Sequence, residues 1–213
     1  LTACGAPKQL SKSVTVELGN EKGINIADIL DISKDKVKDA KLNTKKVDFF
    51  KTGEYDATIT YDKKDYSVKV KIKDTTAPEA AAKESIVVQP GAVLHVTDCL
   101  DKITELSGNV DAKFETKPEA KDSTESTEPL SDEDAAAIYE VSGVRLSDDD
   151  EITYTEAGDY DNNIIITDKS GNKTTVAVKI SVINAPSING VTDKTVTVGD
   201  SIDYMAGVTA ADG

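Results

Sequence analysis

Short runs of alternating apolar and polar residues dominate the chain, and they predict β-strands rather than helices. Residues 68–73 alternate Val, Val and Ile with three lysines, the period-two pattern of a strand with one buried and one solvated face. The β-rich run 57–61 comes before it, and the polar residues 62–65 lie between the two runs. These three segments predict a β-hairpin.

A second hairpin is predicted by the runs 162–167 and 174–182. The turn between them contains Ser170-Gly171-Asn172, which supplies the residues that adopt positive φ in tight hairpins. The two hairpins begin alike, because Gly53-Glu54-Tyr55-Asp56 recurs as Gly158-Asp159-Tyr160-Asp161. The chain therefore contains an internal repeat.

The starts of the repeated units share a pattern too. Residues 13–17, 85–89 and 194–198 are short β-branched runs, each followed by a glycine-containing turn. Each hairpin ends near an Ala-Pro pair, at 77–78 and 185–186, where proline would stop the strand ladder. We expect a tether at 1–12, one domain at 13–78, a second at 79–186, and the truncated start of a third repeat at 187–213.

These motifs resemble the bacterial immunoglobulin-like repeats of Gram-positive surface proteins. The resemblance rests on the Gly-x-Tyr-Asp starts, the turn at 168–172, the Asp-Thr-Thr-Ala-Pro segment 74–78 and the Val-Gly-Asp-Ser-Ile-Asp segment 198–203. It implies an all-β fold of tandem immunoglobulin-like β-sandwich domains, with Tyr55 and Tyr160 near a sheet corner. The first unit departs from the pattern, since Lys63-Lys64 stands where Gly-Asn is expected and the unit is short.

The second domain carries an acidic insertion. Residues 115–134 contain eight acidic residues, with Leu130 as the one large apolar side chain. Such a segment buries too little apolar surface to offset its ordering entropy, so we expect a mobile loop. Ser131-Asp132-Glu133-Asp134 is typical of a capping box, which predicts a short helical turn over 135–138.

Charge excludes one class of partner. The chain carries 39 acidic and 25 basic residues, a net charge of −14. Residues 79–186, with 23 acidic and nine basic residues, have a net charge of −14, whereas residues 13–78 have +1. Nucleic acid is therefore not an expected partner.

The first residues predict an attachment to a membrane. Leu1-Thr2-Ala3-Cys4 is followed by a short polar stretch. The tetrapeptide resembles a bacterial lipoprotein lipobox, which implies that the Cys4 sulfur carries a diacylglycerol. The alternative is a chance tetrapeptide.

If Cys4 is lipidated, Cys99 has no intramolecular partner. Cys99 lies in the apolar run 93–100, so we expect a buried structural cysteine rather than a reactive thiol. The single histidine, His95, is expected on the half-exposed face of a strand. One histidine and no Gly-x-Ser-x-Gly motif give no support to a nucleophile triad, so no catalytic residue and no cofactor are expected.

The acidic residues give only weak support to a calcium-binding site. Adjacent carboxylates in the run Asp148–Glu151 cannot all converge on one ion, and a solvated turn is the favoured interpretation. Asp159, Asp161, Asn162 and Asn163 could add oxygens, but strand alternation would point them to opposite faces. No metal site is therefore predicted.

Together these features predict a non-enzymatic protein on the extracellular face of a bacterial membrane. Its modules would act as a stalk or adhesion array, anchored through Cys4. One alternative is a module that binds a carbohydrate or host protein through a sheet face or the 115–134 loop. Another is a set of accessory modules of a larger surface enzyme.

Overall fold

The structure is a computed structural model that describes residues 6–118, 139–193, 195–199 and 201–211. Cys4, most of the acidic insertion and the expected helical turn at 135–138 lie outside the described residues. Contacts divide the chain into two units. The first comprises Leu1–Glu79, Thr104–Val110 and Thr167–Lys173, and the second comprises Ala80–Ile103, Asp111–Ile166 and Thr174–Gly213. The first continuous part of the first unit ends at Glu79, and the division also assigns to this unit the two later segments 104–110 and 167–173.

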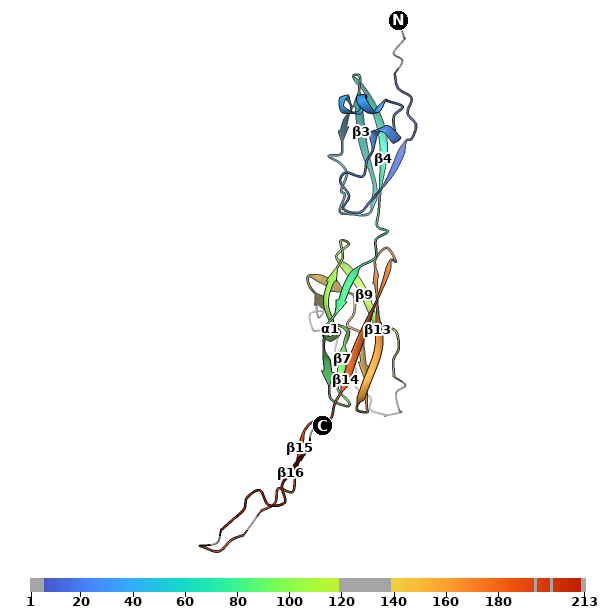
Figure 1. Cartoon of the computed structure of the whole chain (residues 1–213). Helices are drawn as coiled ribbons and strands as arrows, with labels where there is room; N and C mark the ends of the chain where they lie inside the picture. Colours follow the sequence, from blue (N-terminus) through green and yellow to red (C-terminus); the bar gives the residue numbers. More distant parts are fainter. Residues whose placement is uncertain (1–5, 119–138, 194, 200, 212–213) are drawn as a thin grey trace, which may run out of the picture. The chain divides into compact units, whose positions relative to one another are not determined.

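The first unit contains a four-stranded sheet in the order β1-β4-β3-β2. Its strands are β1 (Ser13–Glu17), β2 (Lys41–Asn43), β3 (Gly53–Tyr61) and β4 (Lys64–Lys73), and two short 3-10 helices, η1 (Ile26–Asp28) and η2 (Lys34–Asp39), lie between β1 and β2. β3 and β4 pair antiparallel, whereas β1 pairs parallel with β4, with Val14 opposite Val70. Figure 1 shows β3 and β4 running side by side.

One face of this sheet forms the core of the first unit. Val68, Val70 and Ile72 are buried, and the lysines between them are exposed, as the period-two pattern predicts. The turn after β3 is shorter than the expected 62–65: Tyr61 pairs with Lys64, so only Asp62 and Lys63 connect the strands. Both have positive φ, 47° and 60°, the conformation of a type I′ hairpin turn, here without glycine.

The second unit contains a six-stranded sheet in the order β10-β11-β9-β13-β14-β6. These strands are β6 (Ile86–Val88), β9 (Asn109–Phe114), β10 (Glu140–Val141), β11 (Val144–Leu146), β13 (Gly158–Asp168) and β14 (Lys173–Val182). Two short pairs accompany it, β12 (Glu151–Thr153) with β7 (Val93–His95), and β5 (Glu79–Ala82) with β8 (Leu100–Thr104). β6 pairs parallel with β14, just as β1 pairs with β4 in the first unit.

The chain is all-β and immunoglobulin-like, and both tyrosines that mark the repeat lie where that fold needs them. Tyr55 Oη donates a hydrogen bond of 2.9 Å to the carbonyl of Lys51. Tyr160 Oη donates an equivalent bond of 2.9 Å to the carbonyl of Glu156. Each bond runs four residues upstream and closes a tyrosine corner at the start of a long strand.

The run 93–100 departs from the expected single strand. β7 ends at His95, a one-turn helix α1 (Val96–Cys99) follows, and β8 begins at Leu100. His95 is the last residue of β7 and its side chain is 40% exposed, so the expected half-exposed strand histidine is confirmed. Cys99 is a free, fully buried cysteine, and burial raises the pKa of its thiol to about 12.

The described residues after Pro186 form a two-stranded antiparallel ribbon of β15 (Ser187–Asn189) and β16 (Thr209–Ala211). The expected strand at 194–198 is wrong over 195–198, which are not in a strand. Apolar side chains of this segment remain exposed, among them Ile188 and Val198, so they provide no packed face to hold that strand in place. Among the helices of the described residues, none is long and apolar enough to span a bilayer.

Candidate functional site

The acidic run 148–151 is not the solvated turn that the sequence predicts. The side chain of Asp149 is 7% exposed. Its carboxylate accepts hydrogen bonds from the backbone N–H and the hydroxyl of Thr97, at 3.0 and 2.8 Å. Because Thr97 is in the only turn of α1, Asp149 fixes that helix to the segment before β12.

Asp150 makes a different set of contacts. Its carboxylate accepts a hydrogen bond from the backbone N–H of Phe114, at 3.1 Å, and pairs with the ammonium of Lys117. Burial alone would raise the pKa of Asp150, but the bonds from Lys117 and Phe114 outweigh burial and hold it below its usual value. The two neighbouring carboxylates thus bond to different elements, Asp149 to α1 and Asp150 to the end of β9, and do not converge.

The oxygen-bearing side chains around Tyr160 are also separated. Asp159 accepts a 2.6 Å bond from the Ser181 hydroxyl, while the Asn163 amide donates to Glu115. Asn162 is 6% exposed and bonds to Thr116 and the Tyr154 hydroxyl. They do not gather around one point, in agreement with strand alternation.

We expect Asp150 to contribute to acid sensitivity. A depressed pKa in the folded state means that the charged carboxylate stabilises the fold above the unfolded pKa, and that this contribution is lost as the pH falls through the folded value. Asp150→Asn should lower the free energy of unfolding by about 1 kcal/mol at neutral pH, with the difference closing as the pH falls through the lowered pKa of the folded state. Urea unfolding across this pH range measures the change. Asp148→Asn is the control, and a gap that stays constant with pH would contradict the assignment.

His95 lies near this run, but the contacts do not form a nucleophile triad. Its Nδ1 is 3.7 Å from a carboxylate oxygen of Asp149 and 3.8 Å from one of Glu151. In a triad the imidazole stands between the nucleophile and the carboxylate. Here the Thr97 hydroxyl bonds to Asp149 directly, so among the described residues this cluster has the arrangement of a structural support.

A second acidic cluster, absent from the sequence predictions, lies within the first unit. One carboxylate oxygen each from Asp74, Glu105 and Asp168 lie within 4.8 Å of one another. Asp74 and Asp168 are 8% and 5% exposed. Asp74 follows β4 directly, Asp168 ends β13, and Glu105 follows β8.

Hydrogen bonds of the turn 168–172 position this cluster. Asp168 accepts bonds from the backbone N–H groups of Ser170 and Asn172, at 2.8 and 2.9 Å. The amide of Asn172 donates to Asp168 and to the carbonyls of Asp74 and Thr76. The Ser170 hydroxyl donates to the Asp74 carboxylate at 3.2 Å. The motif Asp-x-Ser-Gly-Asn therefore does more than turn a hairpin, since its side chains also hold the segment 74–76.

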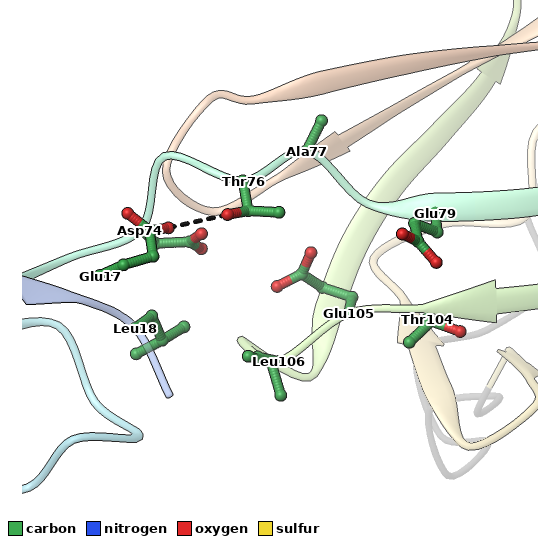
Figure 2. Close-up of a pocket in the computed structure, with 9 residues that line it drawn as sticks. All are labelled: Glu17, Leu18, Asp74, Thr76, Ala77, Glu79, Thr104, Glu105 and Leu106. Carbon is green, nitrogen blue, oxygen red and sulfur yellow. Dashed lines mark hydrogen bonds between the residues drawn. The ribbon is translucent and has the colours of Figure 1, made fainter. Parts of the chain in front are cut away.

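A cavity of about 220 Å³ adjoins the cluster (Figure 2). Glu17, Asp74, Glu79 and Glu105 contribute carboxylates to its lining, and Leu18 and Leu106 contribute apolar surface. Glu17 accepts bonds from the backbone N–H and hydroxyl of Thr75 and from the hydroxyl of Thr76. The bond from the Thr75 backbone is the main reason that the pKa of Glu17 lies below its usual value.

Chemically, these carboxylates are oxygen donors of the kind that Ca²⁺ takes, but three of them are fewer than its usual six to eight ligands. Both oxygens of Asp168 already accept hydrogen bonds within the turn. The turn explains the geometry of the cluster without an ion, and the predicted absence of a metal site stays a prediction. Asp74 and Asp168 lie inside the two motifs that the sequence marks, whereas nothing in the sequence distinguishes Glu105.

No known protein family matches the chain, and no curated protein does. Among solved structures, extracellular cadherin domains 3–6 of protocadherin gamma B2 match with 15% identity and a TM-score of 0.35, over 97% of this chain and 55% of that one. A chimeric titin Z1Z2 matches with 14% identity and a TM-score of 0.28, over 83% and 96%. Extracellular domains 3–5 of Drosophila OTK match with 15% identity and a TM-score of 0.25, over 62% and 40%. The chain spans about half the length of the protocadherin structure, and at these values no residue role is transferred from any of them.

Proposed function

We propose that the protein is a non-enzymatic surface protein whose immunoglobulin-like modules act as a stalk or adhesion array. The observation that supports this proposal is that the two units share the same structural features. Both units close a tyrosine corner, at Tyr55 and Tyr160, and both pair an early strand parallel with the last strand of the hairpin. Repeated modules of this kind suit the role of a spacer or a contact surface.

The carboxylates and the histidine favour the same role. Asp149, Asp150 and Asp168 are engaged in bonds that fix α1, a strand and a turn, and His95 lies beside carboxylates with no hydroxyl or thiol nucleophile of the described residues bonded to it. These groups support the fold at the ends of strands. They have no arrangement suited to general acid–base catalysis.

Attachment to the membrane is the second part of the proposal, and it rests on the tetrapeptide Leu1-Thr2-Ala3-Cys4. A diacylglycerol on Cys4 would insert two acyl chains, enough for stable anchoring, where one chain would be marginal. The modules would then lie on the extracellular face of a bacterial membrane.

Replacing the anchoring cysteine tests this part. In the full-length gene product expressed in its natural host, Cys4→Ala should move the protein from the membrane fraction to the medium, because the acylated sulfur is lost. Fractionation followed by immunoblotting measures the shift. Cys99→Ala is the matched control, since Cys99 is buried within the fold and should not affect attachment. Membrane association unchanged in Cys4→Ala would refute the anchor.

Two other functions stay open as proposals. One is a module that binds a carbohydrate or host protein through a sheet face or residues 115–134. This binding function would be favoured if the protein bound a specific ligand and lost that binding when residues 115–134 were deleted. The other is a set of accessory modules of a larger surface enzyme, which would be favoured by catalytic activity in the full-length gene product that these modules lack alone.

A further inference from the structure

The ribbon of β15 and β16 contains the dipeptide Asn189-Gly190. Asn189 is the last residue of β15 and pairs with Thr209 of β16. Of the asparagines in the sequence, it is the one that a glycine follows. The backbone nitrogen that follows an asparagine can attack the amide carbon of that side chain, and glycine leaves the approach open because it has no Cβ. This dipeptide is therefore the place in the chain where the sequence most favours such a reaction.

The fold requires a glycine at position 190. Gly190 has a φ of +79°, in the left-handed region that other residues rarely adopt. A Cβ at this position would lie 1.9 Å from the carbonyl oxygen of Gly207, a distance too short for any non-bonded contact. The unhindered backbone nitrogen is thus a consequence of the way the chain leaves β15.

No comparable requirement holds asparagine at position 189. Asn189 is exposed, and among the described residues its amide donates one hydrogen bond, to the Ser187 hydroxyl at 3.4 Å. The second unit offers a comparison, because β5 follows the first Ala-Pro pair directly, as β15 follows the second. Counting from the proline, Ala81-Ala82 stands where β15 has Asn189-Gly190. A strand can therefore form at this point of the repeat without the reactive dipeptide.

Pairing of the ribbon controls access to the reaction. Ring closure turns the Gly190 nitrogen toward the Asn189 side chain, and the extended backbone of a paired strand holds the two apart. All residues of β15 and β16 are exposed, and in the described part of the chain these two strands form a sheet of their own. A two-stranded ribbon without a packed face is only marginally stable, so it opens at a small cost in free energy. Asn189 is therefore protected while the strands are paired and reactive when they separate.

We propose that Asn189-Gly190 is a self-modification site that changes the ribbon irreversibly. The Gly190 nitrogen gives up its proton and bonds to Cγ of Asn189, the bond from Cγ to the amide nitrogen breaks, and ammonia leaves. Water then opens the resulting five-membered succinimide at either of its carbonyl groups, giving aspartate or isoaspartate. Either product adds a negative charge, and isoaspartate also adds one carbon atom to the backbone opposite Thr209. The lengthened backbone no longer matches the register of β16, so the modified ribbon stays open.

The test follows the purified chain during incubation at physiological pH and temperature. Tryptic cleavage after Lys179 and Lys194 gives one peptide that contains both Asn184 and Asn189. Fragmentation of this peptide in a mass spectrometer should locate the gain in mass, from amide to acid, at Asn189 and not at Asn184, which alanine follows. Labelling by isoaspartyl methyltransferase should identify the isoaspartate product. Equal conversion at the two asparagines, or none at Asn189, would overturn the proposal.

A reversible cross-link tests the role of strand pairing. Ser187 lies opposite Ala211, so Ser187→Cys with Ala211→Cys, in a Cys4→Ala background, places a disulfide across the ribbon while Cys99 stays buried. The oxidised protein should convert at Asn189 about tenfold more slowly than the reduced protein, because its strands cannot separate. Equal rates in the two states would contradict the control by pairing.

Asn189→Gln is the matched variant for the structural consequence. Glutamine keeps the amide, but its longer side chain cannot form the five-membered ring with the next nitrogen. After incubation, cross-strand nuclear Overhauser effects between β15 and β16 should be lost in the converted chain and kept in the variant. Cross-strand effects that persist in the converted chain would overturn the irreversible opening. The site does not depend on Cys4 or on an adhesive role, so the failure of either proposal leaves the other standing.

Discussion

Asn162→Ala is expected to destabilise the second unit by about 3 kcal/mol, although alanine is the residue that the first unit uses at the same repeat position, Ala57. The Asn162 side chain accepts from the Thr116 hydroxyl at 2.9 Å and donates to the Thr116 carbonyl at 2.8 Å and to the Tyr154 hydroxyl at 3.2 Å. Asn162 and Tyr154 are both buried, so removing the amide takes this partner from the Tyr154 hydroxyl inside the fold, whereas the exposed Thr116 can bond to water instead. Thermal and urea unfolding of the full chain, followed by resonances of the second unit, measure the loss.

The reverse substitution completes this test. Ala57 is 4% exposed within the apolar core of the first unit, so Ala57→Asn buries an amide among apolar side chains and should destabilise that unit by about 2 kcal/mol or more. Asn163→Ala is the control, because its amide bonds to Glu115 at the surface and its loss should cost less than about 1 kcal/mol. If Asn162→Ala were as mild as Asn163→Ala, the buried network around Tyr154 would have no stabilising role.

The repeated part of the fold could be predicted from the sequence because local pattern and tertiary packing agree there. The alternation at 68–73 gives the buried and exposed faces of β4 directly. The tyrosines of Gly-x-Tyr-Asp could be placed at a corner because the resemblance supplied the fold, and both hydrogen bonds are present. Cys99 could be recognised as buried because the run 93–100 contains Val93, Leu94, Val96 and Leu100.

Local geometry within those elements was harder to predict. Asp62 and Lys63 adopt positive φ without glycine, so the two-residue turn at 62–63 could not be distinguished from a longer one. The one-turn helix α1 is too short to have a periodic pattern of its own, and its N-terminal bonds come from residue 149, far along the chain. Contacts of that kind are tertiary, and hydrophobic periodicity does not record them.

The roles of the acidic residues could not be predicted from the sequence either, because they too depend on tertiary contacts. From the sequence, Asp148, Asp149 and Asp150 are three equal carboxylates in a polar run. Among the residues that the structure describes, Asp148 bonds only to the next backbone N–H, while Asp149 and Asp150 reach Thr97 and Phe114. Similarly, Asp74 and Asp168 meet only because the side chains of Ser170 and Asn172 bridge two segments about a hundred residues apart. Which carboxylates are structural depends on pairings that only the fold creates.

Asp149→Ala is the second large effect that we expect, a loss of about 2 kcal/mol in the free energy of unfolding of the second unit. The change removes both charge-assisted bonds to Thr97 and leaves the N–H of a residue in α1 without its acceptor. Because α1 lies directly between β7 and β8, hydrogen exchange should increase across residues 93–104 before the rest of the unit responds.

Asp148→Ala is the matched control, since it removes a neighbouring surface carboxylate whose one hydrogen bond within the described part of the chain is from the backbone N–H of Asp149. We expect it to change stability by less than about 0.5 kcal/mol and to leave exchange at 93–104 unaltered. Asp149→Asn keeps an acceptor for Thr97 but removes the charge, so it should lie between the two. Equal effects of Asp148→Ala and Asp149→Ala would mean that the run is a solvated turn after all. The predicted order, with alanine at 149 worst, asparagine at 149 intermediate and alanine at 148 nearly neutral, follows only if the carboxylate of Asp149 holds α1 in place.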